Sequence, residues 1–231
     1  MGDRRQHRKD RVQDRMQQKI HKAKKASSGA SRRIRNICVY CGSNIGTNPA
    51  YAAAARQLGQ SMAKERIGLV YGGGGLGLMG ELARAVLADG GRVTGIIPAF
   101  LSVKERMLRD VTELVVVDDM HQRKKLMFDK SDAFVALPGG IGTLEELVEQ
   151  LTWAQLGRHK KPILILNIKG FWDPLRALLD HMRRLDFIRL ELGVTLLASE
   201  EPEGILPKLR AAAAAVTEGE KQGKPETVER M

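Results

Sequence analysis

Three glycine-rich segments are the features of this sequence that point most directly to chemistry. Each follows a predicted strand: CGSN at residues 41–44, with Gly42 and Ser43; YGGGGLGLMG at residues 71–80, with Gly73 and Gly74; and PGGIGTLEE at residues 138–146. Glycines between a strand and a helix let backbone N–H groups approach a ligand, and the N-terminus of the following helix favours an anion. Tight turns alone also select glycine, but three such segments at one edge of a sheet predict a ligand that carries a phosphate group.

The second of these segments also contains a formal G-x-G-x-x-G pattern at Gly75, Gly77 and Gly80, which is typical of dinucleotide-binding domains. That fingerprint follows the first strand of its unit and needs a carboxylate at the end of the next strand to hold the ribose hydroxyls. Here the glycines follow the second predicted strand, and the next strand ends in Ile97 and Pro98. We therefore interpret the match as fortuitous. Neither long segment continues with Lys and Ser or Thr, which excludes a Walker A loop.

Glu146, at the end of the third glycine segment, is a candidate catalytic carboxylate. It lies three residues after Thr143, a spacing that fits a capping box at the start of a helix. A carboxylate in the first turn of a helix is favoured in its ionised form by the helix dipole. Glu146 therefore suits a base, or a group that stabilises positive charge, better than a proton donor.

A cluster of cations forms the second charged candidate, at residues 119–125 (DMHQRKK). Asp119 is a plausible N-cap of a helix, and Arg123, Lys124 and Lys125 then crowd its first turns, where the dipole disfavours them by a few tenths of a kcal/mol each. Solvated surface explains poorly why they lie at the sheet edge that carries the glycines. An arginine there can hold a phosphate or a carboxylate through two hydrogen bonds.

Metal and cofactor chemistry finds little support in the sequence. The five His residues show no ligand spacing, so we expect no metal and no cofactor. Cys38 and Cys41 form a C-x-x-C pattern, but Cys38 falls inside a predicted buried strand and the pair supplies only half a zinc site. We favour packing over a redox or zinc role.

The elements that must position these residues alternate along the chain. Short apolar runs predict strands at 37–40, 68–71, 92–97, 114–117, 133–137 and 162–166. Amphipathic stretches predict helices at 49–65, 78–89, 120–130, 143–156, 172–185 and 202–216. Strands that are apolar throughout, joined by helices, predict a doubly wound, Rossmann-like parallel α/β sheet in a single domain, with helices on both faces. Ligands of such sheets bind beyond the carboxyl ends of the strands.

Composition places this domain between two polar ends. The net charge of +11 is concentrated up to Asn36, where thirteen Lys and Arg face three Asp, so the remainder carries only +1. We expect a basic extension at 1–33, a domain at 34–216 and a flexible tail at 217–231. For the extension, a solubilising segment or an upstream start that is not used is favoured over an arm that binds nucleic acid. No apolar run of membrane-spanning length and no secretory signal are found, which predicts a cytoplasmic protein without membrane contact.

Taken together, these motifs resemble those of the Lonely Guy (LOG) family, often labelled lysine decarboxylases. The resemblance covers residues 35–200 and is carried by MHQRK (120–124) and PGGIGTLEE (138–146), with support from CGSN and from GLMG (77–80). It implies hydrolysis of the N-glycosidic bond of an N6-substituted AMP to a free base and ribose 5-phosphate, and it implies a homodimer with residues 120–130 and 143–156 near the interface. Nothing in the sequence marks a Schiff-base lysine in a pyridoxal-phosphate site.

The resemblance also assigns residues. It implies that Arg123 and Glu146 are the catalytic pair. The implied substrate contacts are Glu105, Lys124, Gly140, Ile141, Gly142, Thr143 and Thr152, to which position in the glycine segments adds Gly42, Ser43, Gly73, Gly74 and Gly139, and position at the same sheet edge adds Met120. Arg123 either locks Glu146 or binds ribose and phosphate oxygens, and Thr152 either faces the pocket or packs. A nucleotide-binding module without catalysis and a nucleic-acid-associated protein remain as alternatives.

Overall fold

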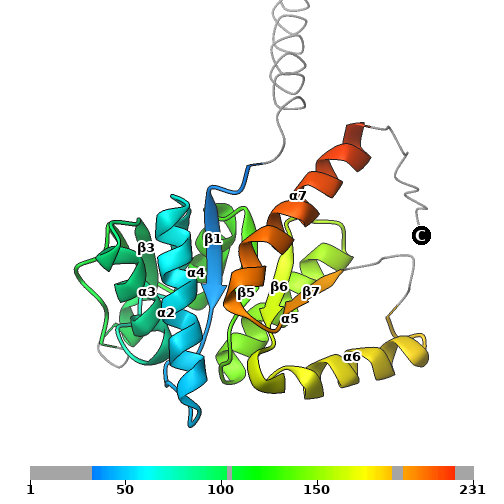
Figure 1. The fold of residues 1–231 in the computed structure, drawn as a ribbon, viewed down its shortest axis with the longest axis horizontal. Helices are drawn as coiled ribbons and strands as arrows, with labels where there is room; N and C mark the ends of the chain where they lie inside the picture. Colours follow the sequence, from blue (N-terminus) through cyan, green and yellow to red (C-terminus); the bar gives the residue numbers. More distant parts are fainter. Residues whose placement is uncertain (1–32, 103–105, 189–194, 222–231) are drawn as a thin grey trace, which may run out of the picture. The chain divides into compact units, whose positions relative to one another are not determined.

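The computed structural model describes residues 33–102, 106–188 and 195–221 (Figure 1). The chain divides into two compact units, Ile34–Ala213 and a second made of Met1–Arg33 with Ala214–Met231. The first unit contains the whole sheet and is the one described below. In the described residues, no helix combines the length and the apolar character needed to cross a membrane.

The sheet has seven strands in the order β4-β3-β2-β1-β5-β6-β7, and every neighbouring pair is parallel. Its strands are β1 (Asn36–Tyr40), β2 (Gly68–Tyr71), β3 (Val93–Pro98), β4 (Glu113–Val117), β5 (Ala133–Ala136), β6 (Ile163–Leu166) and β7 (Leu196–Ser199). The central strands are buried along their length because both faces of the sheet are covered. The edge strand β4 is partly exposed.

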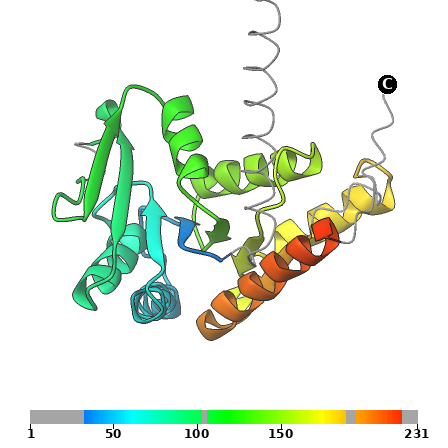
Figure 2. The ribbon, with the colours of Figure 1, turned by 90° about the horizontal axis from the view of Figure 1, so that it is seen from above.

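The described residues form six α-helices, which cover both faces of the sheet (Figure 2). They are α2 (Pro49–Lys64), α3 (Gly77–Ala88), α4 (Met120–Asp129), α5 (Ile141–Gln155), α6 (Asp173–Arg184) and α7 (Ile205–Lys221). One core packs α2, α3 and the part of α7 up to Ala213 against the sheet, and a second core packs α4 and α5 against the opposite face. The doubly wound parallel α/β fold predicted from the sequence is confirmed.

Successive side chains of β1 belong to the two different cores, as the period of a strand requires. Ile37 and Val39 lie in the core with α2 and α3, whereas Cys38 and Tyr40 lie in the core with α4 and α5. Tyr40 therefore ends β1 on the face that carries the cation cluster and the third glycine segment.

The strand order reverses at β1, since the chain moves outward from β1 through β2 and β3 to β4 and then returns to pair β5 with the other side of β1. Ligands of open α/β sheets bind at such a switch point, beyond the carboxyl ends of the strands. The segments that follow β1 and β5 are the first and third glycine segments, and they flank this point.

Two differences from the predicted elements have clear causes. The strand β7 was not predicted because its four residues, LLAS, are too few to show a pattern, and it becomes a strand by pairing with β6. The helix predicted at 143–156 begins two residues earlier, at Ile141, because Gly140 takes the extended N-cap conformation.

Candidate active site

A pocket of about 220 Å³ lies where the three glycine segments meet the helices α4 and α5. Predicted site residues that line it are Gly42, Ser43, Arg123, Gly140, Ile141, Gly142, Thr143 and Glu146. Further lining residues, which were not predicted as site residues, are Val39, Tyr40, Cys41, Gly72, Met79 and Met127. The structure thus brings most of the predicted residues to one hollow at the switch point of the sheet.

The glycine segments touch each other through their backbones. The N–H of Gly42 donates to the carbonyl of Pro138 at 3.1 Å, which joins the segment after β1 to the segment after β5. Gly77, with φ +58°, lies so close to Ser43 that an added Cβ would come within 2.2 Å of the Ser43 carbonyl carbon. Only glycine fits at this crossing, and the prediction that the three segments share one edge is confirmed.

Arg123 is a buried residue of α4. Asp119 caps this helix, as predicted, by accepting a hydrogen bond from the N–H of Gln122 at 2.8 Å. The Nη2 of Arg123 lies 3.4 Å from the carbonyl oxygen of Gly72, and its Nη1 lies 3.7 Å from the sulfur of Met120. The Nε is buried and has no hydrogen-bond partner among the described residues. The guanidinium group therefore keeps donor capacity in spite of its burial.

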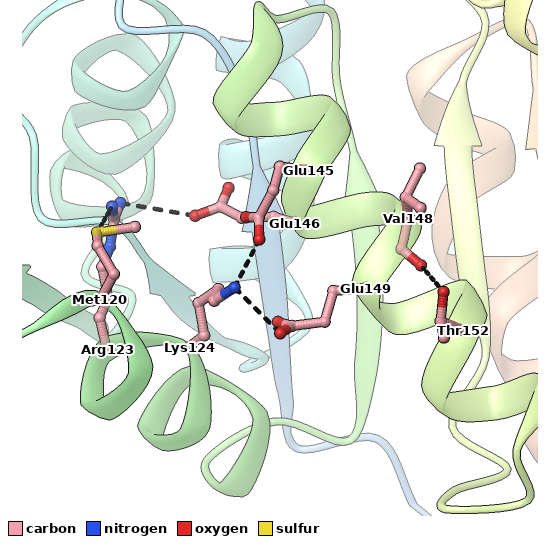
Figure 3. Close-up of polar contacts among 8 residues, drawn as sticks. All are labelled: Met120, Arg123, Lys124, Glu145, Glu146, Val148, Glu149 and Thr152. Atoms are coloured by element: carbon pink, nitrogen blue, oxygen red, sulfur yellow. Dashed lines mark hydrogen bonds and ion pairs between the residues drawn. The ribbon is translucent and has the colours of Figure 1, made fainter.

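Arg123 and Glu146 face each other across the gap between α4 and α5 (Figure 3). Their nearest atoms, Nη2 and Oε1, are 3.8 Å apart, and the side chains are only 7% and 10% exposed. This distance allows strong electrostatic attraction but is longer than a hydrogen bond. A sheltered carboxylate and a sheltered guanidinium group thus lie in the wall of one pocket.

The N-terminus of α5 differs from the capping box that the sequence suggests. Its N-cap is Gly140, and no side chain bonds to the cap, so the interpretation of Thr143 as the capping residue is wrong. Thr143 is the third residue of the helix and is buried, with its Oγ1 in the place that a Cβ on Gly139 would need. Glu146 consequently lies in the second turn, where Arg123 faces it at 3.8 Å.

This start of α5 resembles an anion-binding helix end. The first turn contains no acidic residue, and a Cβ on Gly140 or on Gly142 would meet nothing within 4 Å. Backbone N–H groups at such a helix start have no intrahelical acceptor and attract phosphate groups.

Several predicted site residues lie elsewhere. Lys124 points between Glu145 and Glu149 and is absent from the pocket wall (Figure 3). Thr152 lies on an exposed face of α5, where its hydroxyl donates to the carbonyl of Val148 at 2.8 Å (Figure 3). Gly139 lies against Thr143, and the sulfur of Met120 lies near Nη1 of Arg123, but neither residue is part of the pocket wall.

The remaining predicted contacts belong to the second glycine segment and to a neighbouring segment. The carbonyl of Gly73 accepts from the N–H of Leu108, and Gly74 forms an isolated bridge with Met107, so neither lines the pocket. Glu105 falls outside the described residues.

Tyr40 and Cys38 are buried polar groups beside the site. The only sequence signal that could have identified Tyr40 is its position at the end of a predicted strand. Burial raises the pKa of both groups, and the negative charge of Glu146 raises them further. Both therefore stay protonated at neutral pH. Cys38 and Cys41 carry thiols rather than a disulfide, and they are buried in the two different cores, in agreement with a packing role. No cluster of three or more potential metal ligands occurs among the residues that the structure describes.

Comparisons with known proteins identify the family of this chain. A family model described as possible lysine decarboxylase matches residues 79–209. A probable cytokinin riboside 5′-monophosphate phosphoribohydrolase of Oryza sativa subsp. japonica is 46% identical over 177 residues, which are 77% of this chain and 79% of the relative. A cytokinin riboside 5′-monophosphate phosphoribohydrolase of Arabidopsis thaliana is 50% identical over 148 residues, 64% of this chain and 68% of the relative. The chain belongs to the LOG family. The resemblance noted in the sequence is thereby confirmed.

Solved structures share the LOG fold at greater distance. A molybdenum cofactor binding protein from Rippkaea orientalis has a TM-score of 0.58 and 24% identity, and covers 78% of this chain and 97% of its own. A Moco carrier protein from Chlamydomonas reinhardtii has a TM-score of 0.60 and 21% identity, and covers 79% of this chain and 99% of its own. At these identities the likeness supports the fold alone.

Proposed function

We propose that this LOG-family protein hydrolyses the N-glycosidic bond of N6-substituted adenosine 5′-monophosphates and releases the free base and ribose 5-phosphate. Its curated relatives are named as phosphoribohydrolases of cytokinin riboside 5′-monophosphate. The observation that carries the proposal to this chain is the Arg123–Glu146 pair, which faces the same pocket as the N-terminus of α5.

The 5′-phosphate is held by backbone at the start of α5. The N–H groups of residues 140–143 point to the pocket end of the helix, where the macrodipole favours negative charge. Gly140 and Gly142 leave this end open, and Thr143 adds a buried hydroxyl to the pocket wall. At about 220 Å³, the pocket is smaller than the roughly 300–1,000 Å³ usual for drug-sized ligands. We assign the sugar phosphate to this pocket, next to the N-terminus of α5, and the base to its mouth.

Glu146 and Arg123 divide the chemistry of bond cleavage. Breaking the bond between C1′ and N9 builds positive charge on the ribose, as in glycoside hydrolysis. The carboxylate of Glu146 stabilises that charge and orients or deprotonates the attacking water. Arg123 attracts the carboxylate through its Nη2 side, and its Nε, which has no hydrogen-bond partner among the described residues, is a donor for a ribose or phosphate oxygen. The hydroxyl of Tyr40, kept protonated by burial, adds a neutral polar group to the wall.

The direct test is incubation of the protein with AMP and with isopentenyl-AMP, followed by chromatography for free base and ribose 5-phosphate. We expect both products in equal amounts from at least one nucleotide. A nucleotide that binds and is recovered intact would contradict hydrolysis and support the alternative of a non-catalytic nucleotide- or cofactor-binding protein.

We further propose a homodimer that uses the outer face of α5, with α4 nearby. Ile141, Val148 and Leu156 are 82%, 42% and 75% exposed on or at the end of this helix, and apolar side chains in a row on a surface mark protein contacts. Thr152 lies between the last two along the helix, so its predicted contact to substrate depends on what covers this face.

The terminal segments and the location of the protein stay proposals as well. We propose a domain at 34–216 flanked by a basic extension at 1–33 and a tail at 217–231, and a cytoplasmic location that a tagged protein in cells would test. Contact between the extension and nucleic acid predicts salt-dependent binding that deletion of residues 1–33 removes. Binding that is unchanged by this deletion would contradict it.

A further inference from the structure

A second charged contact joins α4 to α5 directly beside the Arg123–Glu146 pair (Figure 3). The Nζ of Lys124 lies 2.5 Å from Oε1 of Glu145 and 3.0 Å from Oε1 of Glu149. The Lys124 side chain is only 13% exposed, and that of Glu149 is 20% exposed. The Glu145 side chain is 49% exposed, so the contact with Glu149 is the sheltered one, unlike most lysine–carboxylate pairs on a protein surface.

The two contacts are coupled by sequence. Lys124 follows Arg123 on α4, and Glu145 precedes Glu146 on α5, with Glu149 one turn later on the same helix. Any shift of α4 against α5 that breaks the contact of Lys124 also moves Arg123 relative to Glu146. The contact between Nη2 of Arg123 and Oε1 of Glu146, at 3.8 Å, is an ion pair longer than a hydrogen bond, so its geometry depends on how α4 and α5 are held together.

We propose that Lys124 is a positioning residue: its ammonium group ties α4 to α5 through Glu145 and Glu149 and so holds Arg123 opposite Glu146. The inference rests on the proposed function, since it concerns the geometry of that catalytic pair. It differs from a role of Lys124 as a substrate contact, because its charge is directed to two carboxylates and its side chain is not part of the pocket wall.

The surroundings of Lys124 favour a permanently charged tie. Partial burial by itself lowers the pKa of the ammonium group, but the hydrogen bonds and charges of Glu145 and Glu149 outweigh burial and raise it. The second oxygen of Glu149 is buried without a hydrogen-bond partner among the described residues. Both carboxylates lie on α5, so removal of the lysine leaves their mutual repulsion unbalanced and removes the attraction that links α5 to α4.

The experiment compares Lys124→Met, Lys124→Arg and the double variant Glu145→Gln/Glu149→Gln in the base-release assay. A matched control is Lys125→Met, because Lys125 also pairs with a carboxylate, Asp129, but on the exposed side of α4. Lys124→Met and the double glutamine variant are expected to lower kcat by about 10- to 100-fold and to change KM by less than about threefold. The reason is that displacement of Arg123 from Glu146 reduces stabilisation of the transition state and leaves substrate binding nearly unchanged. Lys124→Arg restores most of kcat, and Lys125→Met stays at the wild-type level.

Affinity for ribose 5-phosphate, measured by calorimetry, separates the two roles of Lys124. Positioning predicts affinity within about threefold of wild type in Lys124→Met, because the phosphate is bound elsewhere. A loss of that affinity together with a raised KM, an unchanged kcat and normal glutamine variants would overturn the inference and make Lys124 a substrate contact.

Failure of the proposed function gives a different result. If the wild-type protein releases no base, the proposed hydrolysis is contradicted. Urea unfolding of the same variants then tests whether Lys124 links α4 to α5. If the tie exists, combining Lys124→Met with the two glutamine changes lowers the folding equilibrium constant far less than the product of the separate losses. Losses that simply multiply would overturn it.

Discussion

The guanidinium group of Arg123 occupies the space that a side chain at Gly72 would need. A Cβ built on Gly72 would lie 2.1 Å from Nη2 and 3.2 Å from Cζ of Arg123, and 3.2 Å from the sulfur of Met79. The carbonyl oxygen of Gly72 meanwhile accepts from the same Nη2 at 3.4 Å. The absence of a side chain at residue 72 is thus what lets Arg123 reach across to Glu146.

Gly72→Ala should therefore impair catalysis without touching a charged residue. The added methyl group displaces the guanidinium group from Glu146, so we expect kcat to fall by about 10- to 100-fold and stability to fall by about 1–3 kcal/mol through overpacking. Steady-state kinetics and urea unfolding measure the two effects. Gly219→Ala is the control, because a Cβ there meets nothing within 4 Å. Wild-type kcat in Gly72→Ala would contradict the role of this contact.

The role of Gly72 also illustrates what the sequence could and could not reveal. Periodicity and the glycine segments predicted the parallel sheet, because burial on both faces of a strand leaves a plain apolar run. The meeting of the three segments also followed, because the carboxyl ends of parallel strands share one edge. Gly72, however, is 51 residues from Arg123, and only the folded chain reveals that its missing side chain makes room for the guanidinium group.

The local errors have a similar origin. Thr143 and Glu146 have the spacing of a capping box, but Gly140 starts α5 earlier because an extended glycine can end the loop after β5 without a side-chain cap. Lys124 follows Arg123 in the sequence, yet on a helix neighbouring side chains diverge by about 100°. Arg123 consequently reaches the pocket while Lys124 reaches Glu145 and Glu149.

Glu146→Gln tests the catalytic carboxylate most directly. The amide keeps the shape of the side chain and an oxygen that faces Arg123, so we expect a folded protein with an unchanged circular dichroism spectrum. Turnover should fall by at least about 100-fold, because the charge that stabilises the ribose cation is gone. Initial rates of base release measure this effect, with Glu81→Gln on α3 as a comparison for loss of a carboxylate outside the pocket. Near-normal turnover in Glu146→Gln would leave the residue with a structural role only.

Cys38 predicts a loss of stability at alkaline pH. Burial, and then the negative charge of Glu146, raise the pKa of its thiol, so the folded state keeps the proton while the unfolded chain releases it above roughly pH 8.5. The unfolded state then binds fewer protons, and the free energy of unfolding falls as pH rises, by about 2 kcal/mol near pH 10 from this group. Below roughly pH 8.5 the thiol is protonated in both states and its contribution is complete.

Urea unfolding of wild type and Cys38→Val at pH values from about 7 to 10 measures this effect. Valine fills a similar volume in the strand and cannot ionise, so its stability should decline less steeply than that of the wild type. Parallel declines in the two proteins would mean that Cys38 does not contribute to the alkaline loss.

The exposed apolar side chains of α5 predict that one substitution there separates the subunits. Val148→Glu places a charge in the centre of the row formed with Ile141 and Leu156, and a charge buried in an apolar contact without a partner costs several kcal/mol. We expect light scattering to give twice the chain mass for the wild type and the single mass for Val148→Glu. Phe100→Glu, at a more exposed apolar residue away from α5, should leave the dimer intact. A monomeric wild type, or a dimer that withstands Val148→Glu, would assign the exposed face of α5 to something other than self-association.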